Sequence, residues 1–456
     1  MTRRPAVTPR EVALDVLRAV STDDAYANLL LPTRLRRARL HGQEAAFTTE
    51  LTYGTLRRRG YYDLVIAAAA GRDLAAIDPV ALDVLRLGAH QLLGMATAAH
   101  AAVSETVGLT KWMGAARATG FVNAVLRTIS QADESTWTTR LLDGVTDPVE
   151  RLALEFAHPG WVVRAVRDAL HREGRAHELQ QVLAANNAAP RVMLVALPGL
   201  ADPEALGEVS LFAPTAVPSA AGDPAGHPLV AQGRARVQDE GSQLAALALS
   251  RCRPIVEGER WLDLCAGPGG KAALLAAEAK LGGATLVANE IVPARSRLVR
   301  SALHAVDRAV EVRTSDGREF GEREPAAFDR ILIDAPCTGL GALRRRPEAR
   351  WRKTEGDVGP LVQLQTELLR SALAALAPGG VLAYVTCSPH VAETTGVVDA
   401  VLTERQGEVV PLDAREVLRR VARTEIDLAE LDNGAAQLWP HRHGTDAMFV
   451  QLLTRR

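Results

Sequence analysis

Two of the four cysteines stand where an apolar run ends and a loop or helix is predicted to follow. Cys337 closes the segment Ile331–Cys337, and Cys387 directly follows the run Val381–Thr386. In an open α/β sheet the carboxyl ends of the strands line one crevice, and ligands bind in that crevice. A cysteine thiolate in such a place is a nucleophile that can form a covalent intermediate. The spacing therefore indicates nucleophilic catalysis by cysteine.

A glycine-rich loop is predicted to face these thiols. It follows the predicted strand Trp261–Leu264 and consists of Cys265, Ala266, Gly267, Pro268, Gly269, Gly270 and Lys271. It matches neither the GxGxxG pattern of dinucleotide-binding folds nor a Walker loop. Its glycines permit positive φ angles and a close approach of a ligand, and the next helix offers unpaired N–H groups at its start. We interpret this loop as part of a cofactor site.

Acidic residues follow the next two predicted strands. Glu290 lies about 20 residues beyond the glycines, where nucleotide-binding folds place a carboxylate that accepts hydrogen bonds from a ribose diol. Asp316, after the third strand, could contact an adenine edge. Three strand ends that carry glycines, Glu and Asp in this order indicate an adenosine-bearing cofactor. S-adenosylmethionine fits better than NAD, because the glycine pattern is wrong for a pyrophosphate.

The elements that must hold these residues alternate between strand and helix from about residue 243 onward. Predicted strands are Trp261–Leu264, Leu286–Asn289, Val310–Arg313, Ile331–Asp334, Val381–Thr386 and Phe449–Leu453, with helices at Pro293–Leu303, Leu361–Leu376 and Glu393–Leu402 between them. Strands that alternate with helices predict right-handed crossovers and a parallel, doubly wound sheet. The predicted fold class is α/β with a Rossmann-like sheet over residues 243–456.

The first 242 residues have a different pattern. Residues 1–140 show helical periodicity, and Thr8, Pro9 and Glu11 form a helix start with an N-cap, a first-turn proline and a capping-box partner. We predict a small all-helical domain there. Residues 141–242 are predicted to form a connecting subdomain of mixed structure, with a strand between Pro190 and Pro198 and a loop from Leu211 to His227.

Composition limits the class of protein. The chain has 456 residues, of which 47% are hydrophobic and 23% charged, as in ordinary globular proteins. Its cysteines form no CxxC pair, and His441 and His443 stand without further ligands, so we expect no metal site. The N-terminus Met1–Pro5 lacks an apolar signal core, and no apolar run approaches a membrane span. Reduced thiols suit a cytoplasmic location.

Arginine occurs in three clusters that could form an RNA surface. The first comprises Arg34, Arg36, Arg37 and Arg39, the second Arg57, Arg58 and Arg59, and the third Arg344, Arg345, Arg346, Arg350, Arg352 and Lys353 with Trp351 inside it. For the first two clusters, solvated helix faces are an equally good interpretation. For the third we favour RNA contact, with Trp351 stacking on a base, because this cluster directly follows the Cys337 loop.

Several of these segments resemble the RNA cytosine-5 methyltransferases. The residues Asp334–Gly341, followed by Arg345–Glu348 and Trp351–Arg352, are similar to the fourth motif of that family, and Thr386–Ser388 and Cys265–Lys271 are similar to its sixth and first. Within it, the chain resembles the bacterial Sun/Fmu-type (RsmB) enzymes, which methylate small-subunit ribosomal RNA. Their N-terminal NusB-like helical module resembles residues Phe47–Arg57 and Gly120–Arg127, and their closing hairpin resembles Pro440–Asp446.

The resemblance implies a class I methyltransferase that uses S-adenosylmethionine to methylate carbon 5 of an unstacked cytosine. It makes Cys387 the nucleophile that adds to carbon 6, Cys337 the residue that assists product release, and Arg295 a neighbour of the cofactor. The sequence alone leaves the order of the cysteines open, since DNA cytosine methyltransferases use a Pro-Cys cysteine as nucleophile. Asp334 is expected to hydrogen-bond the base, and Lys271 to hold the base or lower a thiol pKa.

The two remaining cysteines are given less reactive interpretations. A solitary cysteine at a strand end is more often a small buried side chain, and we accept this for Cys252. For Cys265 we expect a backbone role in the cofactor loop.

The chain departs from the family pattern in two places. After Cys387 the family usually has Glu-Asn-Glu, whereas here Glu393 is followed by two threonines, which affects the local helix start but no expected catalyst. Met193 replaces an asparagine in the connecting subdomain, so an RNA contact by that side chain is absent.

Two other functions remain as alternatives to ribosomal RNA methylation. One is methylation of cytosine in tRNA, and the other is a non-catalytic RNA-binding or ribosome assembly factor. The intact cysteines, Asp334 and Lys271 argue against the second.

Overall fold

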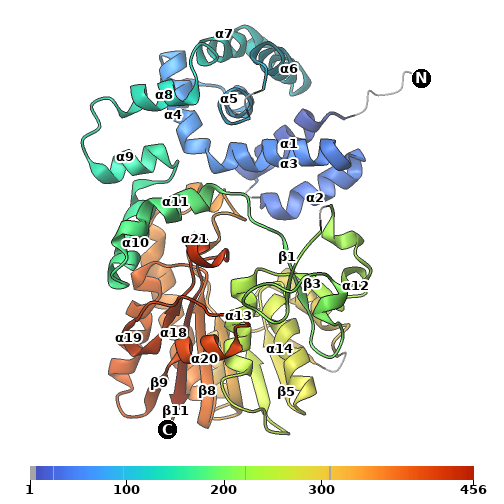
Figure 1. Ribbon diagram of the computed structural model, residues 1–456, viewed down its shortest axis with the longest axis vertical. Coiled ribbons are helices and arrows are strands. Elements are labelled where there is room, and N and C mark those ends of the chain that lie inside the picture. The colour runs from blue at the N-terminus through green and yellow to red at the C-terminus, as the bar shows by residue number, and fades with distance from the viewer. Residues whose placement is uncertain (1–6, 24, 96, 221, 308–309) are drawn as a thin grey trace. The chain divides into compact units, whose positions relative to one another are not determined.

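Helix α1 (Pro9–Thr22) begins where Thr8 and Glu11 predict a helix start. The Thr8 side chain accepts a hydrogen bond from the backbone N–H of Glu11, and the Glu11 carboxylate accepts one from the N–H of Thr8. The computed structural model describes residues 7–23, 25–95, 97–220, 222–307 and 310–456 (Figure 1). The N-terminal segment Met1–Pro5, in which we expected no signal core, lies outside these ranges.

The chain divides into two compact units. Unit 1 comprises Met1–Arg164, Asn186–Ala188 and Leu343–Lys353, and unit 2 comprises the rest. The helices of unit 1 are α2 (Ala27–Ala38), α3 (Gly42–Arg57), α4 (Arg59–Ala70), α5 (Pro79–Ala89), α6 (Ala99–Trp112), α7 (Thr119–Ile129), α8 (Glu134–Leu142), α9 (Pro148–Glu155) and α17 (Ala349–Arg352), together with α1.

The core of unit 1 forms around α5, which packs against α1, α3, α4, α6 and α7. Val84, Leu85 and Leu87 are fully buried there, and Tyr61 and Tyr62 of α4 lie against the same cluster. In this part of the chain the described structure has no strands, so the prediction of an all-helical N-terminal domain is confirmed. Unit 1 also receives the segment Leu343–Lys353 from the middle of the second half of the sequence.

Helices α10 (Gly160–Arg172) and α11 (Leu179–Asn187) lead to a small sheet in unit 2. Its antiparallel strands have the spatial order β2 (Ala216–Pro218), β1 (Met193–Ala196) and β3 (Ala235–Val237). In the chain, the short helix α12 (Pro228–Ala231) lies between β2 and β3. The strand predicted between Pro190 and Pro198 is β1. Strand β2 lies inside the segment that we predicted to be loop, since proline and alanine gave no alternating pattern there.

The large sheet of unit 2 has eight strands. In chain order they are β4 (Arg260–Asp263), β5 (Thr285–Asn289), β6 (Glu311–Arg313), β7 (Phe328–Asp334), β8 (Leu376–Thr386), β9 (Val409–Leu412), β10 (Ala436–Gln437) and β11 (Phe449–Arg455). Strands β6, β5, β4, β7 and β8 are parallel neighbours in this spatial order. Strand β11 pairs antiparallel with β8, β9 and β10. The predicted Rossmann-like α/β class is confirmed, but the sheet is mixed rather than wholly parallel.

Helices cover both faces of this sheet. They are α13 (Glu240–Ser250), α14 (Gly270–Leu281), α15 (Pro293–Leu303), α16 (Phe320–Arg323), α18 (Val358–Ala375), α19 (Thr395–Glu404), α20 (Ala414–Val421) and α21 (Pro440–His443). Alternate strand residues point to opposite faces: Trp261 packs in the cluster with α13 and α14, while Leu262 and Leu264 pack in the cluster with α18 and α19 (Figure 1). This alternation is what a doubly wound sheet requires.

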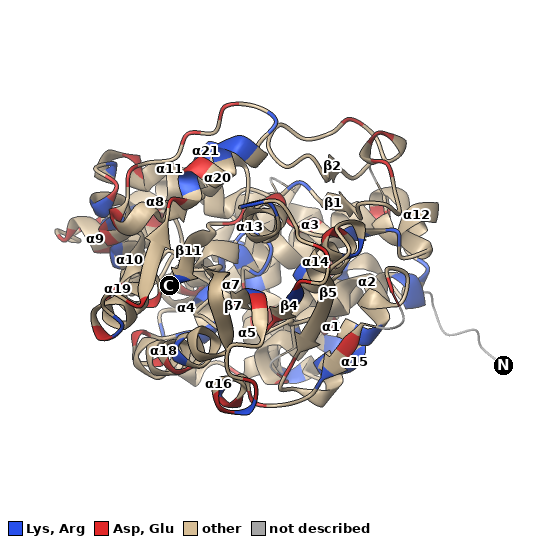
Figure 2. Ribbon diagram, turned by 90° about the horizontal axis from the view of Figure 1, so that it is seen from below, with Lys and Arg blue, Asp and Glu red and all other residues tan. Residues whose placement is uncertain are grey.

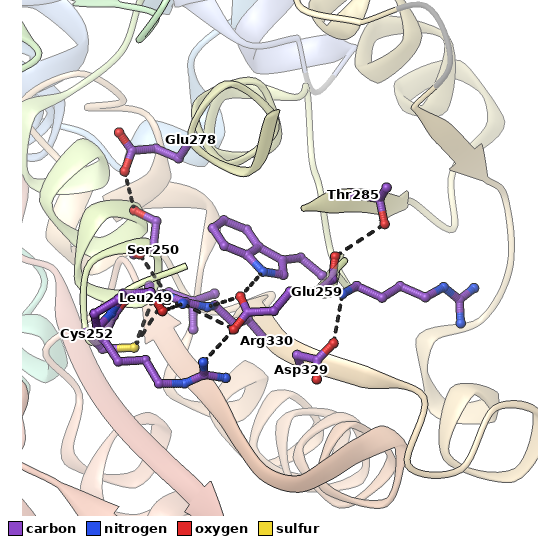
Figure 3. A network of polar contacts seen from close by, with 12 residues as sticks. Leu249, Ser250, Cys252, Glu259, Glu278, Thr285, Asp329 and Arg330 are labelled. Atoms are coloured by element: carbon purple, nitrogen blue, oxygen red, sulfur yellow. Dashed lines mark hydrogen bonds and ion pairs between the residues drawn. The ribbon is translucent and has the colours of Figure 1, made fainter. Parts of the chain in front are cut away.

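A buried arginine holds together the starts of the central strands, whose opposite ends lead to Cys337 and Cys387, and Figure 3 shows its contacts. Arg330 of β7 is fully buried and donates from Nε to Glu259 Oε2 at 2.9 Å. It also donates to the backbone oxygens of Leu249 and Ser250 at the end of α13. These contacts fix β7 beside β4, and so fix the position of the residues at the other end of both strands.

Charged residues of both signs lie next to each other on several surface helices. Arg323 of α16, for example, pairs with Glu319, which directly precedes this helix. Figure 2 shows the basic residues in blue next to the acidic residues in red at α16. None of the helices in the described part of the chain combines the length and apolar character that crossing a bilayer requires.

Candidate active site

The glycine-rich loop connects β4 to α14, as its position in the sequence predicts. Gly267 and Gly269 have φ angles of +59° and +93°, which disfavour other residues. A Cβ atom at Gly269 would lie 2.6 Å from the Cβ of Ala302 in α15, so the loop and helix could not pack as they do. At Gly267 a Cβ atom would meet only a backbone oxygen at 3.9 Å, so the space beside this residue is open to a ligand.

Asp263, the last residue of β4, is a functional candidate that the sequence analysis missed. Its side chain is fully buried, and neither carboxylate oxygen has a hydrogen-bond partner. Burial, followed by the negative charge of Asp334, raises the pKa of Asp263 to about 8. Near neutral pH the carboxyl is therefore mainly protonated, and a ligand that brings a positive charge or hydrogen-bond donors, as S-adenosylmethionine does, would favour its ionised form.

Glu290 lies against the glycine-rich loop. It is buried, accepts a hydrogen bond from the N–H of Gly267 at 3.1 Å, and accepts another from the N–H of Val292 at 2.9 Å. The carboxylate expected to meet a ribose is therefore at the loop, where it also stabilises the loop backbone.

Asp316 lies at the end of the next strand, but its carboxylate is used locally. It accepts hydrogen bonds from the backbone N–H and the guanidinium of Arg318. The loop before it is held by Asn289 of β5, whose Oδ1 accepts from the N–H and the hydroxyl of Ser315. The sequence analysis overlooked this role of Asn289, since an asparagine at a strand end carries no pattern of its own.

Arg295 is exposed on the first turn of α15. The same helix carries Arg297 and Arg300, and it shows blue segments in Figure 2. Its backbone packs against the glycine-rich loop through Val299 and Ala302, but no contact in the structure tests whether the Arg295 side chain meets a cofactor.

Lys271 and Asp334 form an ion pair on the thiol side of the loop. Lys271 Nζ lies 2.8 Å from Asp334 Oδ2, and the lysine side chain is 9% exposed. Burial by itself would lower the pKa of Lys271, but the charge and hydrogen bond of Asp334 outweigh it and the pKa is raised. The lysine is therefore a fixed positive charge at this site rather than a proton donor near neutral pH.

The two cysteines meet at the ends of neighbouring parallel strands. Their Sγ atoms are 3.5 Å apart, and both residues are half-buried. The hydrogen bond with Cys387 and then burial raise the pKa of Cys337 well above its ordinary value. Cys337 thus keeps its proton and can donate a hydrogen bond to Cys387.

Gly341 allows this close approach of the two loops. Its N–H donates to the carbonyl oxygen of Cys387 at 2.8 Å. A Cβ atom at position 341 would lie 2.1 Å from the carbonyl oxygen of Ala447 and 2.8 Å from that of Cys387. Any larger residue would force the segment after Cys337 away from the Cys387 strand.

Glu393 is a second residue that the sequence analysis missed, because we expected its segment to touch no catalyst. It is fully buried and accepts hydrogen bonds from the residues that follow each cysteine, Thr338 and Ser388. The signal in the sequence was the retained first glutamate of the family's Glu-Asn-Glu, which we read only as part of a helix start.

The third arginine cluster is used in part inside the fold. Within unit 1 the Arg350 guanidinium is fully buried and donates to the backbone oxygens of Arg57, Ala157 and Asn186. Trp351 Nε1 donates to the backbone oxygen of Leu56. Arg350 is thus used inside unit 1, and the prediction of an RNA contact is wrong for this residue. Trp351 packs partly buried against the core of unit 1, and stacking of its ring on a base stays a prediction.

The first two clusters differ from each other. Arg57 is buried, and Arg58 bonds to Glu134 and covers the ring of Tyr61, so the second cluster is mainly part of the fold. In the first cluster Arg37 and Arg39 are exposed on and just after α2, which leaves an RNA contact open there.

The remaining cysteines have no place in the thiol pair. Cys252 donates to the backbone oxygen of Leu249 and packs against the hydrophobic cluster formed with α13 and α14. Burial, followed by the charges of Asp263 and Asp334, raises the pKa of Cys265 well above its ordinary value, so this thiol is not a nucleophile. His443 is buried, and His441 is half-buried with its side chain bonded to Glu178. Over the described ranges no three His, Cys, Asp or Glu side chains are grouped as metal ligands would be.

Comparison with known families and proteins identifies a methyltransferase domain and a NusB domain. A family model described as 16S rRNA methyltransferase RsmB/F matches residues 253–454, and the NusB family model matches residues 7–131. The chain is 48% identical over 99% of its length to a Mycobacterium tuberculosis protein named "Putative methyltransferase Rv1407", of which 98% is covered. It is 33% identical over 88% of its length to a Pseudomonas putida protein named ribosomal RNA small subunit methyltransferase B, of which 90% is covered.

A solved structure shares the fold. The crystal structure of PH0851 superposes with a TM-score of 0.80, covers 99% of this chain and 100% of its own, and is 21% identical in sequence. At that level of identity the likeness concerns the fold alone.

Proposed function

The chain belongs to the RsmB/F family of 16S rRNA methyltransferases, and from this premise we propose that it methylates carbon 5 of a cytosine in small-subunit ribosomal RNA through a covalent cysteine adduct. As a family member it is an S-adenosylmethionine-dependent methyltransferase. The observation that carries the proposal is the pair of sulfur atoms 3.5 Å apart beside the Lys271–Asp334 ion pair.

Carbon 5 of cytosine needs activation before it can take a methyl group. The Cys387 thiolate forms a bond to carbon 6, and the electrons of the 5,6 double bond move toward carbon 5 and the ring. Bound S-adenosylmethionine supplies the electrophilic methyl group that carbon 5 then accepts. The proton on carbon 5 must leave afterwards, so that its electron pair restores the double bond while the bond from carbon 6 to sulfur breaks.

The two cysteines have separate roles in these steps. Cys337 holds its proton in the free enzyme chiefly because of its hydrogen bond with Cys387. Once Cys387 is bonded to carbon 6, this cause is gone, and Cys337 can lose its proton to solvent and become a thiolate. Cys337 is then the group placed to accept the proton from carbon 5, and release of the product returns Cys387 as a thiolate.

Asp334 acts on the ring, and Lys271 acts through that carboxylate and through its charge near Cys387. Asp334 stands three residues before Cys337, and its side chain is 33% exposed, so it can still reach the edge of a base. We assign it the hydrogen bond to the ring nitrogen and amino group that stabilises charge during addition. Lys271 holds that carboxylate in position by its charge.

The cofactor would be held by the loop Cys265–Lys271 and by Glu290, with Asp316 and Arg295 at its adenosine end. Asp263, the last residue of β4 before the loop, has no hydrogen-bond partner at either carboxyl oxygen and could meet the cofactor as well. The helical domain, which we place at residues 1–140, would bind RNA, with residues 141–242 as connection and residues 243–456 as the catalytic domain.

Bisulfite sequencing of total RNA tests the substrate class and the position together. RNA from cells with and without the protein is compared, and a single cytosine in the small-subunit ribosomal RNA is expected to be protected only when the protein is present. Protection in tRNA instead would favour the tRNA alternative. Cofactor binding without protection of any cytosine would favour a non-catalytic RNA-binding factor.

A further inference from the structure

A single buried carboxylate joins the two loops that carry the reactive sulfurs. Glu393 is fully buried at the end of a short 3-10 helix, Val391–Glu393, between Cys387 and α19. Its Oε1 accepts from the backbone N–H of Thr338 at 2.8 Å, and its Oε2 accepts from the hydroxyls of Thr338 at 2.5 Å and Ser388 at 2.6 Å. Each of these partners directly follows one of the two cysteines.

A fourth donor extends the same network to α18. Gln365 is fully buried, and its Nε2 donates to Glu393 Oε1 at 3.1 Å and to the backbone oxygen of Pro336 at 2.8 Å. The peptide on either side of Cys337 is therefore held, through Pro336 before it and Thr338 after it. The Thr338 and Ser388 hydroxyls also lie 3.0 Å apart, which closes the network.

The chemistry of this contact is more specific than packing requires. Burying a carboxylate is unfavourable unless hydrogen-bond donors satisfy it, and here four donors do so without a cation. An apolar side chain would fill the same volume at lower cost but could not bind two loops at once. A carboxylate that accepts from both loops sets their relative position to within the length of a hydrogen bond.

We propose that Glu393 is a positioning residue, which holds the Cys337 and Cys387 loops in register so that both sulfurs reach the same base. It acts through Thr338 and Ser388 and does not touch the substrate. The inference rests on the proposed covalent function, because it assigns Glu393 a part in that reaction. Its negative charge also adds, after the hydrogen bond with Cys387 and burial, to the causes that raise the pKa of Cys337.

Three variants separate a positioning role of Glu393 from an effect on the stability of the fold. They are Glu393→Ala, Glu393→Gln and Glu278→Ala. Glu278 is a buried carboxylate of α14 that accepts from Ser250 and Arg251 and touches neither cysteine loop, so Glu278→Ala is the matched control. Turnover on ribosomal RNA is measured per folded molecule. Glu393→Ala is expected to lose about 100-fold or more, since small misplacements of reacting groups have effects of this size. Glu278→Ala is expected to stay within about threefold of wild type, and Glu393→Gln, which keeps shape and one acceptor, to recover part of the loss.

One further readout would not respond to a merely structural role, and a second reports directly on how well the two loops are held. In Glu393→Gln the limb of the pH–rate profile that belongs to Cys337 is expected to move to lower pH, because the amide no longer opposes ionisation of the thiol. Hydrogen exchange of peptides covering residues 335–341 and 387–392 is expected to rise in Glu393→Ala and not in Glu278→Ala. This second measurement requires no activity.

The outcomes distinguish a failure of the positioning role of Glu393 from a failure of the proposed covalent function. If wild-type protein forms no covalent adduct with RNA containing 5-fluorocytosine, the proposed function is wrong and the role of Glu393 falls with it. If the wild type forms the adduct and folded Glu393→Ala turns over as fast, or loses no more than Glu278→Ala, the inference alone is overturned. A Glu393→Ala variant that fails to fold leaves the decision to Glu393→Gln, where an unshifted pH profile together with full turnover overturns it.

Discussion

Cys337 Sγ lies 3.5 Å from Cys387 Sγ, although 50 residues separate the two cysteines in the chain. The parallel pairing of β7 with β8 sets Asp334 opposite Val385 and so brings the two loops side by side. Gly341 and Glu393 then hold the loops together from two sides. Cys337 keeps its proton, and the proposed mechanism assigns the nucleophilic thiolate to Cys387; the predictions on catalysis rest on this division of roles.

Replacing Cys387 by alanine removes the sulfur that bonds to carbon 6. Methyl transfer is expected to fall by more than about 1,000-fold, as when a covalent nucleophile is lost, while the affinity for S-adenosylmethionine changes little. Transfer of labelled methyl groups and calorimetric titration of the cofactor measure the two quantities. Cys252→Ala, which alters a cysteine packed against the hydrophobic core away from the thiol pair, serves as the control and should retain the wild-type rate. Full activity of Cys387→Ala would contradict the covalent mechanism.

Replacing Cys337 by alanine blocks release after the adduct has formed. The variant is expected to accumulate a covalent complex with RNA, which appears as a slowly migrating band that resists denaturant. The double variant lacking both sulfurs should show no such band, because nothing can add to carbon 6. If the band appears with Cys387→Ala and not with Cys337→Ala, the roles of the two cysteines are reversed.

Lys271→Met removes the cation that balances Asp334. The remaining carboxylate lies near the buried Asp263, so the free energy of unfolding is expected to fall by about 1–3 kcal/mol and turnover by roughly 100-fold. Adding Asp334→Asn should restore part of the stability but none of the turnover. Chemical denaturation of both variants and of Lys280→Met, a more exposed lysine of the same helix, measures this. Additive losses in the double variant would show that the ion pair contributes nothing.

Acid is expected to weaken the segment around His443. The Nδ1 atom of this buried histidine accepts from the N–H of Trp439 at 2.8 Å, and Nε2 donates to the backbone oxygen of Asp427 at 2.8 Å, so the ring is neutral. Burial lowers the pKa of His443 to about 4. Because the folded pKa lies below the unfolded value, this stabilisation is complete above about pH 6.5 and is lost as the pH falls to about 4, by about 3 kcal/mol in total.

Urea denaturation at several pH values checks this expectation. The difference in unfolding free energy between wild type and His443→Gln should be largest at pH 7.5 and shrink toward pH 4.5. The exposed His177, replaced in the same way, should show no such trend. A difference that stays constant with pH would mean that His443 does not titrate on unfolding.

Arg350→Met is expected to destabilise unit 1. The change leaves three backbone oxygens and the Asn187 side chain without their donor, at a loss on the order of 3 kcal/mol. Arg37→Met, which changes an exposed arginine of α2, should stay within about 0.5 kcal/mol of wild type. Thermal denaturation followed by helix signal compares the two. An unchanged Arg350→Met would argue that these hydrogen bonds are replaced by water.

Much of the fold was predictable because the signals were local. The cap at Thr8, the helix Pro293–Leu303 and the five parallel strands all appear where short-range chemistry and apolar runs indicated. Strands β9 and β10 were missed, since four and two residues carry too little pattern. The antiparallel direction of β11 was also missed, because strand direction depends on the path of the chain and not on the strand's own residues.

The arginine cluster shows the limit of composition as a guide. Arg350 and Trp351 have the side chains of an RNA surface, and in isolation nothing distinguishes that use from burial against backbone oxygens. Only the packing of residues 343–353 within unit 1 decides it. Glu393 shows the same limit in the other direction, since a glutamate at an expected helix start proved to bind both cysteine loops.

The sequence by itself determined which chemical groups the site contains: two thiols, a glycine-rich loop and acidic residues at successive strand ends, each adjacent in the chain to the element that carries it. The tertiary structure decided which of these groups meet and in what state. Distances between residues far apart in sequence depend on strand pairing, and the charge of a thiol or carboxylate depends on burial and on neighbours that folding brings near. These are properties of the folded chain, and no short segment contains them.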